Sequence, residues 1–178
     1  MSTLRVTAGS LRGRRVSVPP RDVRPTSERA RQAFFDIAGG RIVDSRFLDL
    51  FAGSGIFSFE AISRGAAAAT AVDRDRKSVE AITRRAAEWR APVTAIAGEV
   101  LATVPRLPER FDVVYADPPY DYDQYDALLT ALDGANLSAG ALVAIEHRKR
   151  SNPFTVEPAR LRVRRRAEYG EVWITLFA

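Results

Sequence analysis

The stretch that most constrains the fold of this chain runs from Phe47 to Gly55, with the sequence FLDLFAGSG. Its first five residues are mostly apolar, the next four are small, and a helical pattern follows. This order is typical of a buried parallel strand, a tight turn and the start of a helix. Gly53 and Gly55 would let backbone N–H groups approach a ligand that a Cβ would keep away. Asp49 in the strand is costly to bury unless it accepts hydrogen bonds or faces a ligand.

Three interpretations of this loop compete. A nicotinamide-binding loop requires a third glycine, whose place is taken here by Ser58, and its pyrophosphate would be repelled by the Asp49 carboxylate. A cationic ligand with an amino group suits that carboxylate, and S-adenosylmethionine (SAM) carries both a sulfonium and an α-amino group. A structural turn without a ligand is the third possibility. The loop favours SAM over the other two.

The positive charge of the chain is concentrated in its first part. Residues 1–31 carry eight arginines against two acidic residues, a net charge of +6, whereas the whole chain of 178 residues carries +5. The remainder is therefore almost neutral. A local basic excess on a neutral body is typical of proteins that bind polyanions, and we expect this segment to bind nucleic acid. The alternative is a solvated surface in an arginine-rich protein.

Composition excludes several classes of protein. The chain is 46% hydrophobic, which at this length suits one globular domain with a sizeable core. It has no cysteine, and its single histidine, His147, cannot form a multi-histidine metal site. We expect His147 to be structural. Because no apolar run has membrane-spanning length and no signal-peptide pattern is present, we expect a cytoplasmic monomer that binds neither membrane nor metal.

Hydrophobic periodicity predicts a short hairpin followed by alternating strands and helices. Two short strands flank a Gly-Ser-Leu-Arg-Gly turn within residues 3–18, and this hairpin must pack on the main domain or on a partner. Repeated βα units imply a parallel sheet with helices on both faces, although the last two strands are close enough for a hairpin, so one must be antiparallel. The predicted strands are 46–51, 69–73, 93–97, 111–116, 141–146, 160–168 and 171–177. The predicted helices are 55–64, 75–90 and 122–134, with an earlier one that is capped by Thr26 or Ser27 and ends near residue 38.

Four arginines alternate near the end of the chain, at positions 160, 162, 164 and 166. The period of two would place them on one face of a strand. We interpret this face as protection of an edge strand against aggregation, in preference to a second basic surface.

Four acidic residues fall at the carboxyl ends of predicted strands: Asp49, Asp73, Glu99 and Asp117. Ligands of open α/β sheets bind at this edge, so we expect these residues to form one site. Asp73 suits bidentate hydrogen bonding to ribose hydroxyls, a device that nicotinamide enzymes share. Glu99 would accept a hydrogen bond from an adenine amino group, or be an exposed loop carboxylate.

The sharpest signal is the sequence Asp117-Pro118-Pro119-Tyr120 after a buried strand. Two prolines hold the backbone extended and remove two N–H donors, which leaves rigid carbonyls and one carboxylate beside an aromatic ring. Such a group suits an exocyclic amine on a planar ring. Hydrogen bonds to Asp117 and the Pro118 carbonyl would favour a pyramidal nitrogen, while Tyr120 stacks on the base. Catalysis would rest on orientation and electrostatics.

The loop at residues 49–55 and the motif at 117–120 resemble motifs I and IV of class I SAM-dependent amino-methyltransferases. Motif IV alone is shared by adenine-N6, cytosine-N4 and glutamine-N5 enzymes. Three further segments, 8–14, 23–31 and 60–66, narrow the resemblance. Together these segments resemble the RsmD family of 16S rRNA guanine-N2 methyltransferases over nearly the whole chain.

The resemblance implies a Rossmann-like three-layer sandwich with a seven-stranded, mostly parallel sheet. It implies a basic β-hairpin extension over residues 1–22 that binds RNA, followed by a SAM-dependent methyltransferase domain over residues 23–178. The implied reaction moves a methyl group from SAM to N2 of the guanine numbered 966 in 16S rRNA, within the assembled small subunit.

The resemblance also implies roles for individual residues. The catalytic set is Asp117, Pro118, Pro119 and Tyr120. The SAM-binding set is Asp49, Phe51, Ala52, Gly53, Ser54, Gly55, Asp73, Arg74, Glu99 and Val100. The RNA-binding set is Arg5, Arg12, Arg14, Arg15, Arg24, Arg29 and Arg31.

Three other functions remain to be weighed against this one. An adenine-N6 methyltransferase acting on DNA or RNA would use the same motif IV. A non-catalytic RNA-binding assembly factor that kept the fold would need neither the Asp49 loop nor the Asp117 motif, and both are intact. A nicotinamide dehydrogenase is disfavoured by the missing third glycine.

Overall fold

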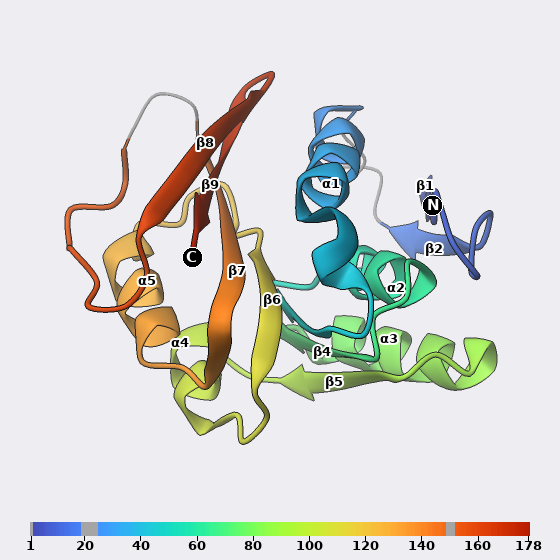
Figure 1. Cartoon of the computed structure of the whole chain (residues 1–178). Helices are drawn as coiled ribbons and strands as arrows, with labels where there is room; N and C mark the ends of the chain where they lie inside the picture. The colour runs from blue at the N-terminus through green and yellow to red at the C-terminus, as the bar shows by residue number, and fades with distance from the viewer. Residues whose placement is uncertain (1, 19–24, 149–151) are drawn as a thin grey trace.

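The computed structural model describes residues 2–18, 25–148 and 152–178 and has a central sheet between two layers of helices (Figure 1). Seven strands form this sheet in the order β5-β4-β3-β6-β7-β9-β8. The strands from β5 to β7 are parallel, and β9 is antiparallel to both of its neighbours. The expected seven-stranded, mostly parallel sheet is therefore confirmed.

The bounds of the elements are as follows. The sheet contains β3 (Arg46–Leu50), β4 (Ala68–Asp73), β5 (Val93–Ala97), β6 (Phe111–Ala116), β7 (Leu137–Arg148), β8 (Val163–Tyr169) and β9 (Val172–Phe177). The helices are α1 (Pro25–Ala38), α2 (Ile56–Ser63), α3 (Arg76–Trp89), α4 (Val100–Thr103) and α5 (Tyr125–Asp133), with short 3-10 turns η2 (Gly39–Ile42) and η3 (Val104–Arg106). A separate two-stranded sheet is formed by β1 (Ser2–Arg5) and β2 (Arg15–Val18).

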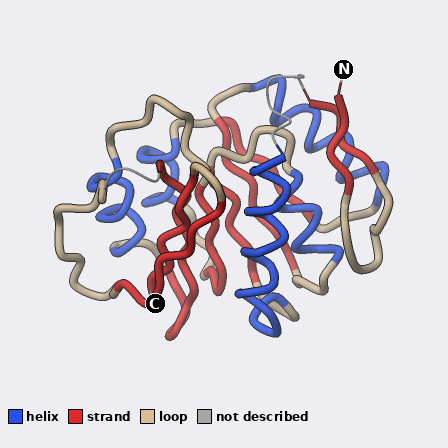
Figure 2. Tube along the Cα trace, turned by 90° about the horizontal axis from the view of Figure 1, so that it is seen from above, coloured by secondary structure: helices blue, strands red, loops and turns tan. Residues whose placement is uncertain are grey.

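Both faces of the sheet are buried, as the near-continuous apolar strands predicted. Residues of β3 alternate between them: Phe47 packs in one cluster with Phe34 of α1, while Leu48 packs in another with Leu128 of α5. Figures 1 and 2 show α1, α2 and α3 on one side of the sheet and α4 and α5 on the other. The three-layer arrangement follows from this alternation.

The N-terminal hairpin packs on the main domain. Val6 and Val16 are fully buried in a cluster with Ile56 and Phe59 of α2 and Ile82 of α3. The two strands of the hairpin, β1 and β2, match the predicted pair of short strands. The predicted domain boundary, between residues 22 and 23, lies outside the described residues.

The turn of this hairpin fits closely against the end of α2. Gly9 has a φ of +78°, and a Cβ there would lie 1.6 Å from the carbonyl oxygen of Ser63. The N–H of Ser10 donates to that same carbonyl at 2.8 Å, and the N–H of Leu11 donates to the Ser63 hydroxyl at 2.8 Å. Glycine at position 9 is thus required both by backbone conformation and by the close approach of another chain segment.

Two predicted elements differ from the observed ones. The strand expected at 141–146 is longer, because β7 starts at Leu137 and continues past Gly140, whose φ is +73°, with a register shift against β6. A glycine can join two strand segments through such a bulge. The helix expected from residue 122 begins only at Tyr125, since the preceding residues belong to the loop after Pro119.

The predicted face of four arginines was wrong. Arg160 and Arg162 precede β8, and a register shift separates Val163 from Arg165 in the pairing with β9, so the alternation is interrupted. The Arg160 guanidinium instead donates to the carbonyls of Asp133 and Ala135, each at 3.1 Å. The edge position of β8 is confirmed. No helix among the described residues is long and apolar enough to cross a bilayer.

Candidate active site

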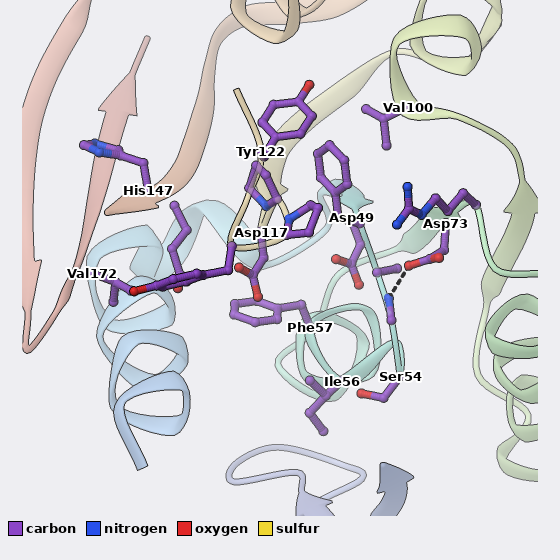
Figure 3. Close-up of a pocket in the computed structure, with 18 of the residues that line it drawn as sticks. Asp49, Ser54, Ile56, Phe57, Asp73, Val100, Asp117, Tyr122, His147 and Val172 are labelled. Atoms are coloured by element: carbon purple, nitrogen blue, oxygen red, sulfur yellow. Dashed lines mark hydrogen bonds between the residues drawn. The ribbon is translucent and has the colours of Figure 1, made fainter. Parts of the chain in front are cut away.

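A cavity of about 530 Å³ lies at the carboxyl ends of the parallel strands. Its volume is within the usual range for small-molecule sites. Figure 3 shows Asp73 and Val100 toward one end and His147 and Val172 toward the other, with Asp117 between them. The hairpin also contributes, through Leu4 and Val18.

All but one of the residues assigned to catalysis or to SAM line this cavity. They are Asp49, Phe51, Ala52, Gly53, Ser54, Asp73, Arg74, Glu99, Val100, Asp117, Pro118, Pro119 and Tyr120. The exception is Gly55. A Cβ at this position would lie 2.8 Å from Cγ1 of Ile82, so its glycine is needed for packing against α3. This packing role is additional to the assignment of Gly55 to SAM, which stays a prediction.

Gly53 has a different role in the loop. Its φ is +51°, and a Cβ there would have only the carbonyl oxygen of Phe51 within reach, at 4.0 Å. Its N–H donates to Oδ2 of Asp73 at 2.7 Å, the bond drawn in Figure 3. This hydrogen bond joins the loop after β3 to the end of β4. The Gly53 N–H is therefore bonded to the Asp73 carboxylate.

Asp49 is a buried carboxylate, only 2% exposed. Its Oδ2 accepts hydrogen bonds from the Ser58 N–H at 3.0 Å and the Ser58 hydroxyl at 2.7 Å. Burial raises the pKa of Asp49 to about 7, although the two bonds from Ser58 act in the opposite direction. A cationic ligand group would stabilise its ionised form. Sequence analysis treated Ser58 only as a missing glycine and overlooked its role as the partner of Asp49.

Asp73 is held in place by the backbone. Besides the bond from Gly53, its Oδ1 accepts the N–H of Asp75 at 2.8 Å. Asp75 in turn caps α3 by accepting hydrogen bonds from the N–H groups of Lys77 and Ser78. Since each carboxylate oxygen can accept about two hydrogen bonds, Asp73 retains acceptor capacity toward the cavity. Beside it, Val100 is buried and Glu99 is exposed.

The loop after β6 forms one wall of the cavity. The N–H of Asp117 donates to the carbonyl of Leu50 at 3.2 Å, which joins this loop to β3. Pro118 is buried, whereas Tyr120 is 61% exposed. The Arg148 guanidinium carbon lies 3.2 Å from the centre of the Tyr120 ring, a cation–π contact. Tyr120 thus presents an aromatic ring at the rim of the cavity, and the planar guanidinium of Arg148 lies over this ring.

Sequence analysis missed the end of β7. Glu146 lines the cavity, and its Oε2 accepts a hydrogen bond from the Tyr115 hydroxyl at 2.7 Å. Tyr115 is fully buried and its ring stacks on Phe57 at 4.0 Å between centroids. A signal was available, because Glu146 is the last residue of the predicted strand 141–146 and therefore falls at the same edge as the other acidic residues.

Two tyrosines complete the wall behind the catalytic loop. The ring of Tyr122 meets Phe51 edge-on at 5.2 Å, and it meets Tyr125 edge-on at 5.1 Å. Burial raises the pKa of both hydroxyls to about 12. Within the described ranges, the Tyr122 hydroxyl is buried and has no hydrogen-bond partner. Nothing in the sequence alone separates these tyrosines from ordinary core residues.

The arginines assigned to RNA lie in different environments. The exposed ones are Arg5, Arg12, Arg14, Arg15 and Arg29, and Arg24 lies outside the described residues. Arg31 is only 2% exposed, and its Nη2 donates to the carbonyl of Arg5 at 2.9 Å. It joins α1 to the hairpin, and burial lowers its pKa. This position corrects the assignment of Arg31 to RNA phosphates.

Both ring nitrogens of the single histidine, His147, have partners within the protein. His147 is buried, with Nε2 2.7 Å from the Thr175 hydroxyl and Nδ1 3.1 Å from the Arg148 carbonyl. These contacts fit the structural role expected for it. In the part of the chain that the structure describes, no group of three or more His, Cys, Asp or Glu side chains could hold a metal ion.

Comparison with known proteins agrees with the fold. The family described as Conserved hypothetical protein 95 matches residues 4–178. Ribosomal RNA small subunit methyltransferase D of Escherichia coli (strain K12) is 30% identical over 177 residues, which cover 98% of this chain and 89% of the relative. Ribosomal RNA small subunit methyltransferase D of Haemophilus influenzae is 30% identical over 161 residues, which cover 86% of this chain and 83% of the relative.

A solved structure, that of yhhF from Escherichia coli, superposes with a TM-score of 0.86 at 28% identity and covers 99% of this chain and 97% of that one. The architecture is that of the class I SAM-dependent methyltransferases. Within this class, the chain belongs to the RsmD family, as its motifs predicted.

Proposed function

We propose that this chain methylates the exocyclic N2 of a guanine in the 16S rRNA of the small ribosomal subunit, at the position numbered 966, with SAM as methyl donor. The observation that carries this proposal is the placement of the Asp117–Tyr120 loop beside the buried carboxylate of Asp49 in one cavity. The name of the Escherichia coli relative supports small-subunit rRNA as the substrate.

The residues of the cavity fit SAM. A buried carboxylate with a pKa of about 7 gains from a cationic neighbour, so Asp49 suits an α-amino group. Asp73 offers fixed acceptors for ribose hydroxyls, and Val100 offers an apolar surface for adenine. The loop residues Phe51, Ala52, Gly53 and Ser54, with Arg74 and Glu99, complete the proposed binding set. SAM would supply an electrophilic methyl group on a sulfonium.

The protein's own part in the reaction is to orient the amine. The Asp117 carboxylate and the Pro118 carbonyl accept its N–H groups, which makes the nitrogen lone pair available for attack. Tyr120 stacks on the base. Because Asp117 is exposed, the proton released from the amine can pass through it to water.

The exposed arginines are proposed to bind RNA phosphates. Arg14 lies over the ring of Trp89, with 5.3 Å between the guanidinium carbon and the ring centre. Trp89 is the last residue of α3, which starts beside the cavity and has 14 residues. At 1.5 Å per residue, Trp89 is about 20 Å along α3 from the end of the helix that lies beside the cavity. The RNA footprint therefore extends well beyond the target nucleotide.

The test is methylation of small subunits that lack the modification. Subunits from a strain without this activity are incubated with labelled SAM and the purified protein, and the digested rRNA is analysed by mass spectrometry. We expect N2-methylguanosine. The Asp117→Ala variant should bind SAM within a few-fold of the wild type and yield no product, because Asp117 acts on the base.

Two results would contradict the proposal. N6-methyladenosine as product would support the adenine-N6 alternative. RNA binding by the wild type without any methyl transfer would support a non-catalytic assembly factor.

A further inference from the structure

Glu146 is the residue that we propose selects guanine at the target position, by accepting hydrogen bonds from the N1–H and N2 amino groups of the base. This inference rests on the proposed function and names the residue that decides between guanine and adenine. It assigns Tyr115 the part of a positioning residue for the Glu146 carboxylate.

The topology places Glu146 beside the catalytic loop. In the parallel pairing of β6 and β7, Ala116 is opposite Ile145, so the next residues along the two strands are Asp117 and Glu146. Paired strands lie about 4.8 Å apart. Both carboxylates line the same cavity. A base whose amine reaches Asp117 therefore has its neighbouring edge close to Glu146.

The Tyr125 hydroxyl lies near both the Asp117 and the Glu146 carboxylates. Burial is the first cause of the raised pKa of Tyr125, and the next two causes are the charges of Asp117 and Glu146. Because Tyr125 lines the cavity as well, the two carboxylates and this hydroxyl share one part of it.

Glu146 is held by a rigid donor. The Tyr115 hydroxyl donates to Oε2 at 2.7 Å, and the Tyr115 ring is fully buried against Phe57, with 15° between the ring planes. A carboxylate can accept about four hydrogen bonds, and the bond from Tyr115 is one of them. Fixing an acceptor in this way is what base recognition requires.

The chemistry of the two purines then decides the selection. Guanine presents adjacent donors, N1–H and the N2 amine, whereas adenine presents an N1 lone pair next to its N6 amine. An ionised carboxylate only accepts hydrogen bonds, so it pairs with the guanine edge and repels the N1 lone pair of adenine. The N2 hydrogen on the N1 side would be shared by Glu146 and the Asp117 carboxylate, and the other would bond to the Pro118 carbonyl, so the amine is oriented from two strands.

The experiment compares two bases at the target position. Small subunits are reconstituted with 16S rRNA that carries either guanine or 2-aminopurine, which keeps the 2-amino group and lacks N1–H. For the wild type we expect kcat/KM to favour guanine by about 100-fold or more, as for sites that lose a designed hydrogen bond.

In Glu146→Gln, guanine kcat/KM should fall by about 10- to 100-fold, and the guanine preference should shrink to about 10-fold or less. The reason is that the glutamine amide can donate to the N1 lone pair of 2-aminopurine. Its carbonyl can still accept the Tyr115 hydroxyl, so the fold should persist, which thermal denaturation and SAM titration would verify.

Two further variants sharpen the test. Tyr115→Phe keeps the buried ring and removes only the donor, so the guanine preference should fall while SAM affinity stays unchanged. The matched control is Glu80→Gln, which removes a carboxylate from an exposed position on α3 and should leave the preference as in the wild type.

The outcomes separate this inference from the proposed function. Transfer by the wild type with an unchanged preference in Glu146→Gln would overturn the role of Glu146 and leave guanine methylation intact. Absence of transfer to guanine by the wild type would overturn the proposed function, and this inference with it.

Discussion

At the scale of single residues, the site depends on carboxylates whose hydrogen-bond partners are not their neighbours in the sequence. Asp49 is satisfied by Ser58 nine positions later, and Asp73 by Gly53 twenty positions earlier. Glu146 is satisfied by Tyr115, 31 positions earlier. Each carboxylate is thus held in one orientation before any ligand arrives, which lowers the conformational cost of binding.

Replacing Asp49 with asparagine should stabilise the ligand-free protein in a pH-dependent way. Folding raises the pKa of Asp49 from 3.8 to about 7. Between these two pH values the folded state binds a proton at Asp49 that the unfolded state does not bind. The unfolding free energy of the wild type therefore falls as pH rises through this window. Asparagine stays neutral. Its advantage in unfolding free energy should grow from about pH 4 to about pH 7, reaching a few kcal/mol, and then level off.

Thermal denaturation across this pH range measures the effect, and SAM titration supplies the control, since Asp49→Asn should bind SAM poorly. An advantage of the same size at every pH would mean that the Asp49 carboxylate is not the titrating group.

Two substitutions at Tyr120 separate the ring from the hydroxyl. Tyr120→Ala should lower the rate of rRNA methylation by about 10- to 100-fold, since base–aromatic stacking contributes roughly 1–3 kcal/mol. Tyr120→Phe should stay largely active, because the ring provides the stacking surface and the contact with Arg148. Steady-state methylation of small subunits measures both. Equal loss in the two variants would refute stacking.

At the scale of elements, α2 connects the cavity to the hairpin. Ser58 near its start bonds to Asp49, Glu60 in its middle accepts the N–H of Thr7 at 2.9 Å, and Ser63 at its end accepts the N–H of Ser10 at 2.8 Å. Arg64 donates to the buried Glu60 at 2.9 Å. Two of the three segments that narrowed the family resemblance, 8–14 and 60–66, are therefore the two sides of one contact.

Gly9→Ala should detach the hairpin from α2. The new Cβ would overlap the Ser63 carbonyl, so we expect a loss of roughly 2–4 kcal/mol in unfolding free energy, from strain at positive φ together with the overlap. Urea denaturation measures it. Gly13→Ala is the matched control, because Gly13 also has a positive φ, +87°, with nothing within 4 Å of its Cβ.

The control should lose about 1–2 kcal/mol, the cost of a left-handed conformation alone. If the two variants lost the same amount, the contact between Gly9 and Ser63 would not stabilise the protein.

At the scale of the whole molecule, the basic excess lies in residues 1–31, which include the appended hairpin, and the rest of the α/β chain is almost neutral. One exposed arginine of this hairpin, Arg14, lies over Trp89 at the end of α3. A target base must be flipped out of folded rRNA at a cost of a few kcal/mol, and the contacts that offset this cost must lie outside the cavity.

Changing Arg12, Arg14 and Arg15 together to alanine should weaken small-subunit binding and flatten its salt dependence. Each phosphate contact contributes up to about one unit to the slope of log affinity against log salt, so the slope should fall by up to about three. Affinity across a salt series measures it. The control removes Arg41, Arg106 and Arg110, exposed residues that precede β3 and β6 at the opposite edge of the sheet. Parallel slopes for wild type and the hairpin variant would exclude these arginines as phosphate contacts.

Sequence analysis reached most of the fold because its signals are local. Period-two and helical patterns, glycines after strands and two adjacent prolines depend on neighbouring residues only, so the strand edges at Asp49, Asp73 and Asp117 could be predicted. The same reasoning failed for Arg160, because its guanidinium bonds to residues before β7, and for Arg162, because β8 begins only at Val163.

The amino-acid sequence by itself determined the α/β architecture, the family and the acidic edge where the cavity forms. Only the tertiary structure decided which partners these residues have: Ser58 for Asp49, Ile82 against Gly55, Arg5 for Arg31 and Tyr115 for Glu146. The physical reason is range. Secondary structure, and which residues of a strand are buried, follow from neighbours along the chain. The hydrogen bond that orients a carboxylate depends instead on how distant strands and helices pack.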